Sequence, residues 1–264
     1  MTRQAAVILS YPAHLLQSAL TIRSIRRFHP EIDRYIVVID NWSNLAWSGY
    51  VDDAREFYQG LGSETVCATD LDCLAEIWNP WVRQQTIKLY LDQLIPVTSW
   101  FFSDGDCVLL ESWPVGVRSM HHVPFGELSK RFNQYVSWML RLPDWSGLRN
   151  SLGQYATSSA PPVRDMKSSD LVALRRYIFQ VHQEEVWQIH QRRQTNPGFI
   201  PSEWELIDCF DTHVQKIPTQ YQNRRHLVHM GWQPDSHYDP KFWGDLHVPK
   251  HLWRKLPLVR YLKN

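Results

Sequence analysis

The chain has 264 residues, 44% of them hydrophobic, and 28 basic residues against 27 acidic ones give a formal net charge of +1 at pH 7. A chain of this size and hydrophobic content buries a substantial core, and we expect a single domain over residues 1–264. The basic residues are scattered, which argues against a nucleic-acid-binding protein, because duplex binding needs a concentrated positive surface.

The segments between residues 1 and 110 alternate between strand-like and helix-like patterns. Apolar runs predict buried strands, at 5–10, 35–39, 65–68 and 100–103. Apolar residues at helical spacing predict helices, over 15–28, 51–61 and 81–95. This alternation predicts an α/β fold, a Rossmann-like, mostly parallel sheet flanked by helices. Ligands of such sheets bind beyond the carboxyl ends of the strands, where the sequence places Ser10, Asp40 and Asp104.

The second half, residues 111–264, is less regular. A further strand is predicted over 117–123, and helices are predicted over 128–140, 170–191 and 202–214. Residues 156–169 are rich in Ser and Pro and are expected to form a surface loop, and the tail from 226 onward has no clear periodicity. We therefore expect a helical, irregular C-terminal part within the same domain.

No segment approaches the roughly 20 apolar residues of a membrane span, and the apolar run within residues 1–9 is too short for a signal peptide. We therefore expect a cytoplasmic protein. Peripheral membrane contact stays open, because the 13 Trp exceed what most cores require and Trp favours interfaces. The cysteines show no metal spacing and are expected to be reduced, buried thiols; they are Cys67, Cys73, Cys107 and Cys209.

The sequence Asp104-Gly105-Asp106 follows the fourth predicted strand. Two carboxylates so close together suit a divalent cation that also holds phosphate oxygens. An Asp-Gly pair is also an ordinary turn signal. The position at a strand end of a parallel sheet favours the metal site over the plain turn.

Three positions near the predicted strand ends are candidates for nucleotide binding. Gln84 and Lys88 lie four residues apart on one helix face, where they either contact a nucleotide or form a solvated edge; for the neighbouring Arg83 we favour the solvated edge. Tyr11, after Ser10 and before a helix start, either stacks on a base or covers the core. The loop after the first strand contains no glycine, which argues against a dinucleotide-binding dehydrogenase and a Walker-type loop.

Residues 202–205, Ser-Glu-Trp-Glu, have the form of a capping box, in which Ser202 and Glu205 cap the helix reciprocally. That role explains Glu205 and leaves Glu203 as a candidate general base, kept ionised by the helix dipole. Asp208 and Asp211 on the same helix are alternatives.

Twelve histidines are present, and any one of them is more often structural than a metal ligand. One late histidine joining two aspartates would complete one face of an octahedral ion. His229 is our choice and His247 the second. The adjacent His121 and His122 lie on a predicted strand, where alternation directs them to opposite faces.

The helix Trp-Val-Arg-Gln-Gln-Thr-Ile-Lys-Leu over 81–89, followed by Phe-Phe-Ser-Asp-Gly-Asp, resembles a GT-A glycosyltransferase. More narrowly, it is similar to a bacterial group that pairs such a helix with an Asp-x-Asp strand end and carries a Ser-Glu-aromatic-Glu-Leu segment, as in residues 202–206. The similarity covers residues 5–110 well and 198–215 in outline. It implies a nucleotide-sugar-binding half over 1–110 and an acceptor-side half over 111–264.

The resemblance implies that Asp104 and Asp106 hold Mn²⁺ or Mg²⁺ against the diphosphate of a nucleotide sugar, usually UDP-linked. A late histidine, here His229, would be the third ligand. The nucleotide would lie near the following residues: Ser10, Tyr11, Asp40, Gln84 and Lys88.

The implied activity is transfer of a sugar, a hexose above all, to a glycan or another hydroxyl acceptor. In an inverting enzyme Glu203 would deprotonate that hydroxyl, with Asp208 as the second choice; a retaining enzyme would need no such base. A nucleotidyltransferase is a second hypothesis, although residues 10–17 lack its Gly-rich basic loop. A non-catalytic binding module, with Asp104-Gly105-Asp106 as a turn, is the third.

Overall fold

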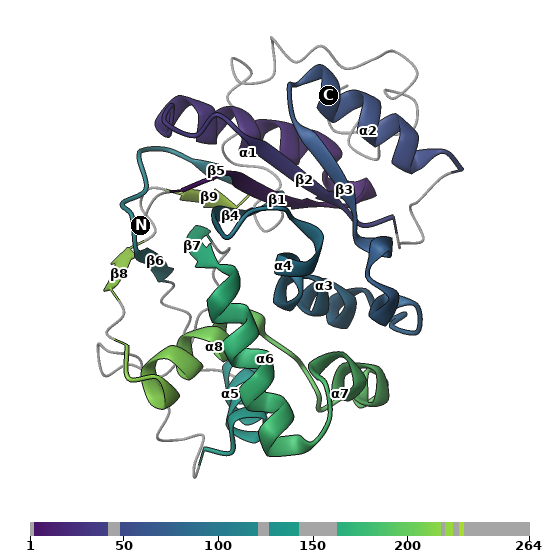
Figure 1. Ribbon diagram of the computed structural model, residues 1–264, viewed down its shortest axis with the longest axis vertical. Coiled ribbons are helices and arrows are strands. Elements are labelled where there is room, and N and C mark those ends of the chain that lie inside the picture. The colour runs from purple at the N-terminus through teal and green to yellow at the C-terminus, as the bar shows by residue number, and fades with distance from the viewer. Residues whose placement is uncertain are drawn as a thin grey trace.

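The computed structural model describes residues 3–41, 48–120, 127–142, 163–217, 220–223 and 227–229. Its centre is a five-stranded sheet in the order β3-β2-β1-β4-β7 (Figure 1). The first four strands are parallel, and β7 runs antiparallel beside β4. The strands are β1 (Ala6–Ser10), β2 (Tyr35–Ile39), β3 (Glu64–Cys67), β4 (Ser99–Asp104) and β7 (Val163–Lys167). The predicted α/β class and its four parallel strands are confirmed.

Helices cover both faces of this sheet. They are α1 (Leu15–Phe28), α2 (Tyr50–Gly60), α3 (Pro80–Leu89), α4 (Leu91–Leu94), α5 (Glu127–Leu140), α6 (Ser168–His182), α7 (Val186–Arg193) and α8 (Glu203–Cys209). Successive strand residues point to opposite faces, so Ala6 and Ile8 pack with α1 and α2, whereas Val7 and Leu9 pack with the helices from α3 to α8. Both faces of β1 are therefore buried, which explains its unbroken apolar sequence.

Two small sheets and four single turns complete the described chain. β5 (Cys107–Leu109) pairs antiparallel with β9 (Leu227–His229), and β6 (Val117–Met120) pairs parallel with β8 (Gln220–Asn223). The turns are η1 (Pro12–His14), η2 (Ala68–Asp70), η3 (Asp72–Leu74) and the π-helical turn η5 (Phe210–Val214) that continues α8.

The helix predicted over 81–95 is wrong in its continuity, because it breaks between α3 and α4. Tyr90 has φ −121° and ψ 16°, outside helical geometry. The carbonyl of Leu89 accepts a hydrogen bond from the guanidinium of Arg175 on α6, and the same guanidinium binds Asp92 at 2.6 Å. The Arg175 guanidinium, distant in the sequence, thus replaces the backbone N–H that would bond to the Leu89 carbonyl if the helix continued.

Two further predictions are corrected in the second half. The helix predicted over 170–191 is divided into α6 and α7 at Gln183, which adopts the left-handed conformation with φ 56°, and a capping box at Glu185 starts α7. The loop predicted over 156–169 contains strand β7. Its sequence Val-Arg-Asp-Met-Lys reads as polar, but Arg164 and the Asp165 side chain are buried by ion pairs.

In the described part of the chain, no helix combines the length and the apolar character needed to cross a membrane. All the cysteines are free thiols, as predicted. Cys107 and Cys209 are buried, whereas Cys67 and Cys73 are only partly buried.

Candidate functional site

Asp104 ends β4 at the carboxyl edge of the parallel sheet. Strand β1 lies between β2 and β4, so the chain crosses over to opposite sides of β1. Asp104 is the register partner of Leu9 at the end of β1. Ligands of open α/β sheets bind in the crevice at such a switch point, and the aspartates therefore lie where the sequence predicted a site.

Gly105 is required by a close approach between the turn and the sheet. A Cβ atom there would lie 2.4 Å from both the carbonyl oxygen of Leu9 and the Oγ of Ser18. The hydroxyl of Thr21 donates to the Gly105 carbonyl at 3.1 Å. The turn is thus held against β1 and α1, which fixes the direction of Asp104 and Asp106.

Lys88 joins two carboxylates that are far apart in the sequence. Its Nζ lies 2.9 Å from Oδ1 of Asp104 and 2.7 Å from Oε1 of Glu203. Lys88 and Glu203 are 2% and 1% exposed. The structure thus brings together three predicted site residues, and the solvated reading of Lys88 is wrong.

The acidic side chains outnumber the ammonium of Lys88 here: Asp104 and Glu203 face it, and the charge of Asp106 acts on Asp104. The pKa of Asp104 is raised to about 7, chiefly by burial and also by the charges of Asp106 and Glu203, against the lowering effect of Lys88. Burial likewise raises the pKa of Glu203, while Lys88 and Arg164 lower it. Burial lowers the pKa of Lys88, but the two carboxylates beside it outweigh burial and raise the value overall. Excess negative charge in a buried position is the environment that a divalent cation favours.

Helix α3 contacts the ends of three neighbouring strands. Besides Lys88 at the end of β4, Arg83 binds Asp40 after β2, with Nε at 3.0 Å from Oδ1. Gln84 hydrogen-bonds to Tyr11 after β1, which partly opposes the rise in the Tyr11 pKa caused chiefly by burial. Arg83 is only 3% exposed, so the predicted solvated edge is wrong for this residue: its guanidinium fills a polar gap against the sheet.

Glu203 is positioned by Gln85, which sequence reasoning missed. The Oε1 of Gln85 accepts a hydrogen bond from the backbone N–H of Glu203 at 3.0 Å, which caps the first turn of α8 from outside the helix. Ser202 makes no side-chain cap bond, so the predicted capping box is wrong, and Glu205 is instead buried at 1% exposure. The Gln84-Gln85 pair in α3 is the sequence feature that could have pointed to this contact.

Asp208, the second candidate base, is engaged by a different cation. Its Oδ1 lies 3.3 Å from Nη1 of Arg164 on β7. Arg164 also lies over the ring of Trp204, with its Cζ 5.0 Å from the ring centroid. Asp208 is thus paired with Arg164, whose charge also acts on Glu203, and Asp211 is buried on the following turn.

Ser10 and His14 lie on either side of Tyr11, with contrasting environments. The Ser10 hydroxyl is buried and bonds to Tyr58 at 2.6 Å and to Ser18 at 2.9 Å, so its side chain serves the core. The ring of His14 lies tilted against that of Tyr11, with 4.2 Å between centroids, and its Nδ1 lies 3.7 Å from Oδ2 of Asp106. Burial lowers the pKa of His14, against the raising effect of Asp106, and its Nδ1 is buried without a hydrogen-bond partner. His14 therefore belongs to the site. Its position shortly after a strand end is compatible with this role, but the sequence alone did not identify it.

His229 approaches the site through its backbone. It is the register partner of Cys107 in the β5–β9 pair, one residue after Asp106, and its role as third ligand stays a prediction. His121, His122 and His247 lie outside the described residues. Within the described ranges, no three metal-ligating side chains are grouped closely enough to form a metal site by themselves.

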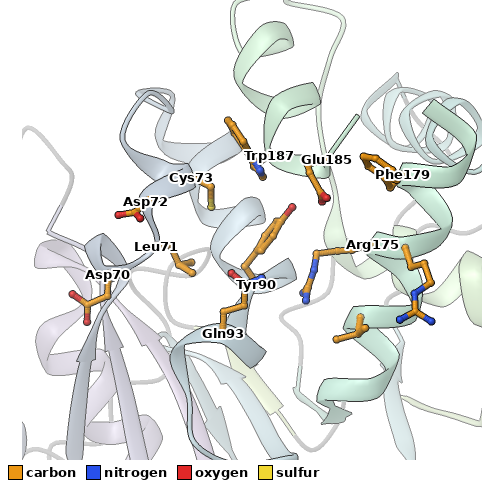
Figure 2. Close-up of a pocket in the computed structure, with 12 residues that line it drawn as sticks. Asp70, Leu71, Asp72, Cys73, Tyr90, Gln93, Arg175, Phe179, Glu185 and Trp187 are labelled. Atoms are coloured by element: carbon orange, nitrogen blue, oxygen red, sulfur yellow. The ribbon is translucent and has the colours of Figure 1, made fainter. Parts of the chain in front are cut away.

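A separate cavity of about 670 Å³ lies between the η2–η3 segment and helices α6 and α7 (Figure 2). Its walls combine aromatic, acidic and basic side chains: Tyr90, Phe179, Trp187, Asp70, Asp72, Glu185, Arg175 and Arg176. Arg175 lies over the Tyr90 ring, 4.6 Å from its centroid. The cavity does not include the carboxylates that Lys88 joins.

No family model matches the chain, and no curated protein sequence matches it. Among solved structures it is similar to the galactosyltransferase LgtC in complex with donor and acceptor sugar analogues, with 12% identity over 96% of this chain and 100% of that one and a TM-score of 0.49. It is also similar to WbbM, a bifunctional glycosyltransferase, with 10% identity over 97% of this chain and 52% of that one and a TM-score of 0.46. The function is therefore argued from the side chains described above.

Proposed function

We propose that the chain is a metal-dependent glycosyltransferase that moves a sugar, a hexose above all, from a UDP-sugar to a hydroxyl acceptor. The observation that carries this proposal is the buried pairing of Lys88 with Asp104 and Glu203, with Asp106 two residues after Asp104. It lies at the topological switch point of the sheet, where α/β folds bind nucleotides.

The residues present suit Mn²⁺ or Mg²⁺. Asp104 and Asp106 are hard oxygen ligands at a turn held rigid by Gly105, and their charge exceeds that of Lys88. The unpartnered, buried Nδ1 of His14 is 3.7 Å from Asp106, and His229 is brought near by the β5–β9 pairing. We propose Asp104, Asp106 and His229 as ligands. A bound ion would supply Lewis acidity that offsets the charge of the departing nucleoside diphosphate.

The chain's own residues would bind the donor and hold a proton. Tyr11, Gln84 and Asp40 surround the strand ends and would contact the nucleotide, with Ser10 contributing through its backbone. For transfer with inversion, Glu203 would accept the acceptor's hydroxyl proton. The raised pKa of Glu203 brings the carboxylate closer to the working range of a general base. Asp208 is less suited, because Arg164 already neutralises it.

The proposal is tested by the melting temperature of the whole chain with UDP-glucose or UDP-galactose, in MnCl₂ and in EDTA. At a donor concentration about 100 times Kd, binding raises the free energy of unfolding by about 2.7 kcal/mol, or roughly 5–10 °C for a protein of this size. Asp106→Asn should abolish the shift, and the matched surface change Asp52→Asn should preserve it, since that side chain is 83% exposed.

The metal is measured directly by titrating Mn²⁺ and following its electron paramagnetic resonance signal. His229→Ala should weaken Mn²⁺ binding by roughly 10–100-fold, the range for groups that support a metal site. No shift with either UDP-sugar, or the same shift in EDTA, would refute metal-dependent donor binding. Release of pyrophosphate from UTP would instead identify a nucleotidyltransferase.

A further inference from the structure

Two large aromatic side chains are exposed at the start of α3. Trp78 is 54% exposed and Trp81 is 43% exposed, although tryptophan is highly buried on average. They lie three residues apart, on either side of Asn79, whose side chain caps the helix. Exposed tryptophans are typical of recognition surfaces.

Trp81 belongs to the helix face that forms the site. Residues 81, 85 and 88 share one face of α3, and all three contact the start of α8. Trp81 Nε1 donates to the carbonyl of Pro201 at 2.7 Å, Gln85 accepts from the Glu203 amide, and Lys88 binds the Glu203 carboxylate. Lys88 and Gln85 are each 2% exposed, so this face runs from the buried carboxylates to solvent. Trp81 is its outer end.

The orientation of the Trp81 ring is fixed before any ligand arrives. The bond to Pro201 holds one edge of the indole, and the ring lies nearly parallel to that of Phe132 on α5, at 16° with 6.4 Å between centroids. Phe132 is buried and belongs to the body of the protein. A ring fixed in this way loses little conformational entropy on binding.

We propose that Trp81, together with Trp78, is the platform on which a sugar ring of a saccharide acceptor stacks. This inference rests on the proposed function, and it makes the acceptor a glycan. The flat indole matches the C–H face of a pyranose, and the sugar's hydroxyls would lie at the edge of the ring. Among the described residues, the polar Asn79 and Gln194 lie beside the tryptophans and hydrogen-bond to one another's backbone. A membrane or protein partner would need a wider apolar surface.

Saturation-transfer NMR on the whole chain tests the platform, with cellobiose, maltose and lactose as probes. We expect transfer to ring C–H protons of at least one disaccharide, and an affinity loss of at least about fivefold in Trp81→Ala, the lower limit for loss of a stacking ring. Trp81→Phe keeps a ring and should retain part of the affinity. Phe179→Ala is the matched control, because Phe179 is 43% exposed on α6 and lines the separate cavity, which does not include Trp81.

Absence of transfer from all three disaccharides, or equal transfer in Trp81→Ala, would overturn the platform. Vesicle binding that depends on Trp81 in place of sugar binding would overturn it in favour of a membrane surface. The Mn²⁺-dependent melting shift with UDP-sugar, measured on the unaltered chain, separates the two proposals. If the shift is present without disaccharide binding, only the platform fails; if the shift is also absent, the proposed function fails too.

Discussion

Protonation of His190 should make the stability of this protein fall steeply in mild acid. His190 on α7 is fully buried, with Nδ1 2.7 Å from the Thr86 hydroxyl and Nε2 2.9 Å from the Tyr135 hydroxyl. The Thr86 hydroxyl also donates to the Val82 carbonyl at 2.8 Å. Its oxygen therefore accepts from Nδ1–H, and Tyr135 donates to Nε2. The folded protein holds a neutral imidazole.

Burial lowers the pKa of His190 from 6.5 to about 3. Between these values the unfolded chain binds a proton that the folded chain does not, so the free energy of unfolding falls as pH falls. Each pH unit contributes about 1.4 kcal/mol. Between pH 7 and pH 5, with the upper end of this window partly titrated, His190 alone lowers the stability by about 2 kcal/mol.

The matched variant is His190→Gln, whose amide is neutral and both donates and accepts. Urea unfolding followed by circular dichroism at pH 7 and pH 5 gives the free energy of unfolding of each protein. We expect the wild type to lose about 2 kcal/mol more than the variant between the two pH values. Contributions from His14, His29 and His182, whose pKa values burial also lowers, cancel in this comparison. Equal losses in both proteins would refute the reasoning.

Two further substitutions, each with a control, test the contacts that position the Asp104-Gly105-Asp106 turn and Lys88. Gly105→Ala should lower the free energy of unfolding by about 1–3 kcal/mol, because its Cβ would meet the Leu9 backbone at 2.4 Å. Gly60→Ala, with nothing within 4 Å, should be neutral or stabilising by up to about 1 kcal/mol. Lys88→Met should cost roughly 3–5 kcal/mol at neutral pH, because it leaves buried carboxylates unpaired, while the exposed Lys167→Met should change stability by less than about 0.5 kcal/mol. Urea titrations give the free energy of unfolding of all four variants. Equal changes in Gly105→Ala and Gly60→Ala, or in Lys88→Met and Lys167→Met, would contradict the contacts described for Gly105 and Lys88.

The sequence was informative where structure follows from local patterns. Apolar runs identify the four parallel strands, although the edge strand β3 is only partly buried, and strand ends identify the edge at which Asp104 lies. Lys88 and Glu203 were each selected for a local reason, the first for its helix face and the second for its place in the first turn of a helix. Their contact at 2.7 Å follows from the tertiary fold.

Three of the errors share one physical cause, which is a polar group satisfied by a distant partner. Asp165 makes β7 look like a loop, yet it binds Arg3 at 2.6 Å across 162 residues. Arg175 ends α3 from a different helix. Gln85 replaces Ser202 as the cap of α8 from 118 residues away. Local propensity assigns such groups to solvent, because their partners lie outside any local window.

The polar face of α3 links the site to the stability of the fold. A buried charge is costly unless it is paired, and Arg83 and Lys88 find their partners at the ends of β2 and β4. Each ion pair therefore holds the helix on the sheet and also sets the position of a carboxylate at the ligand edge. It follows that a change which frees Asp104 for a ligand also removes a contact that holds α3 in place. Variants of Lys88 should thus lose stability and site geometry together, whereas variants of Trp81, at the exposed end of the same face, should separate acceptor binding from folding.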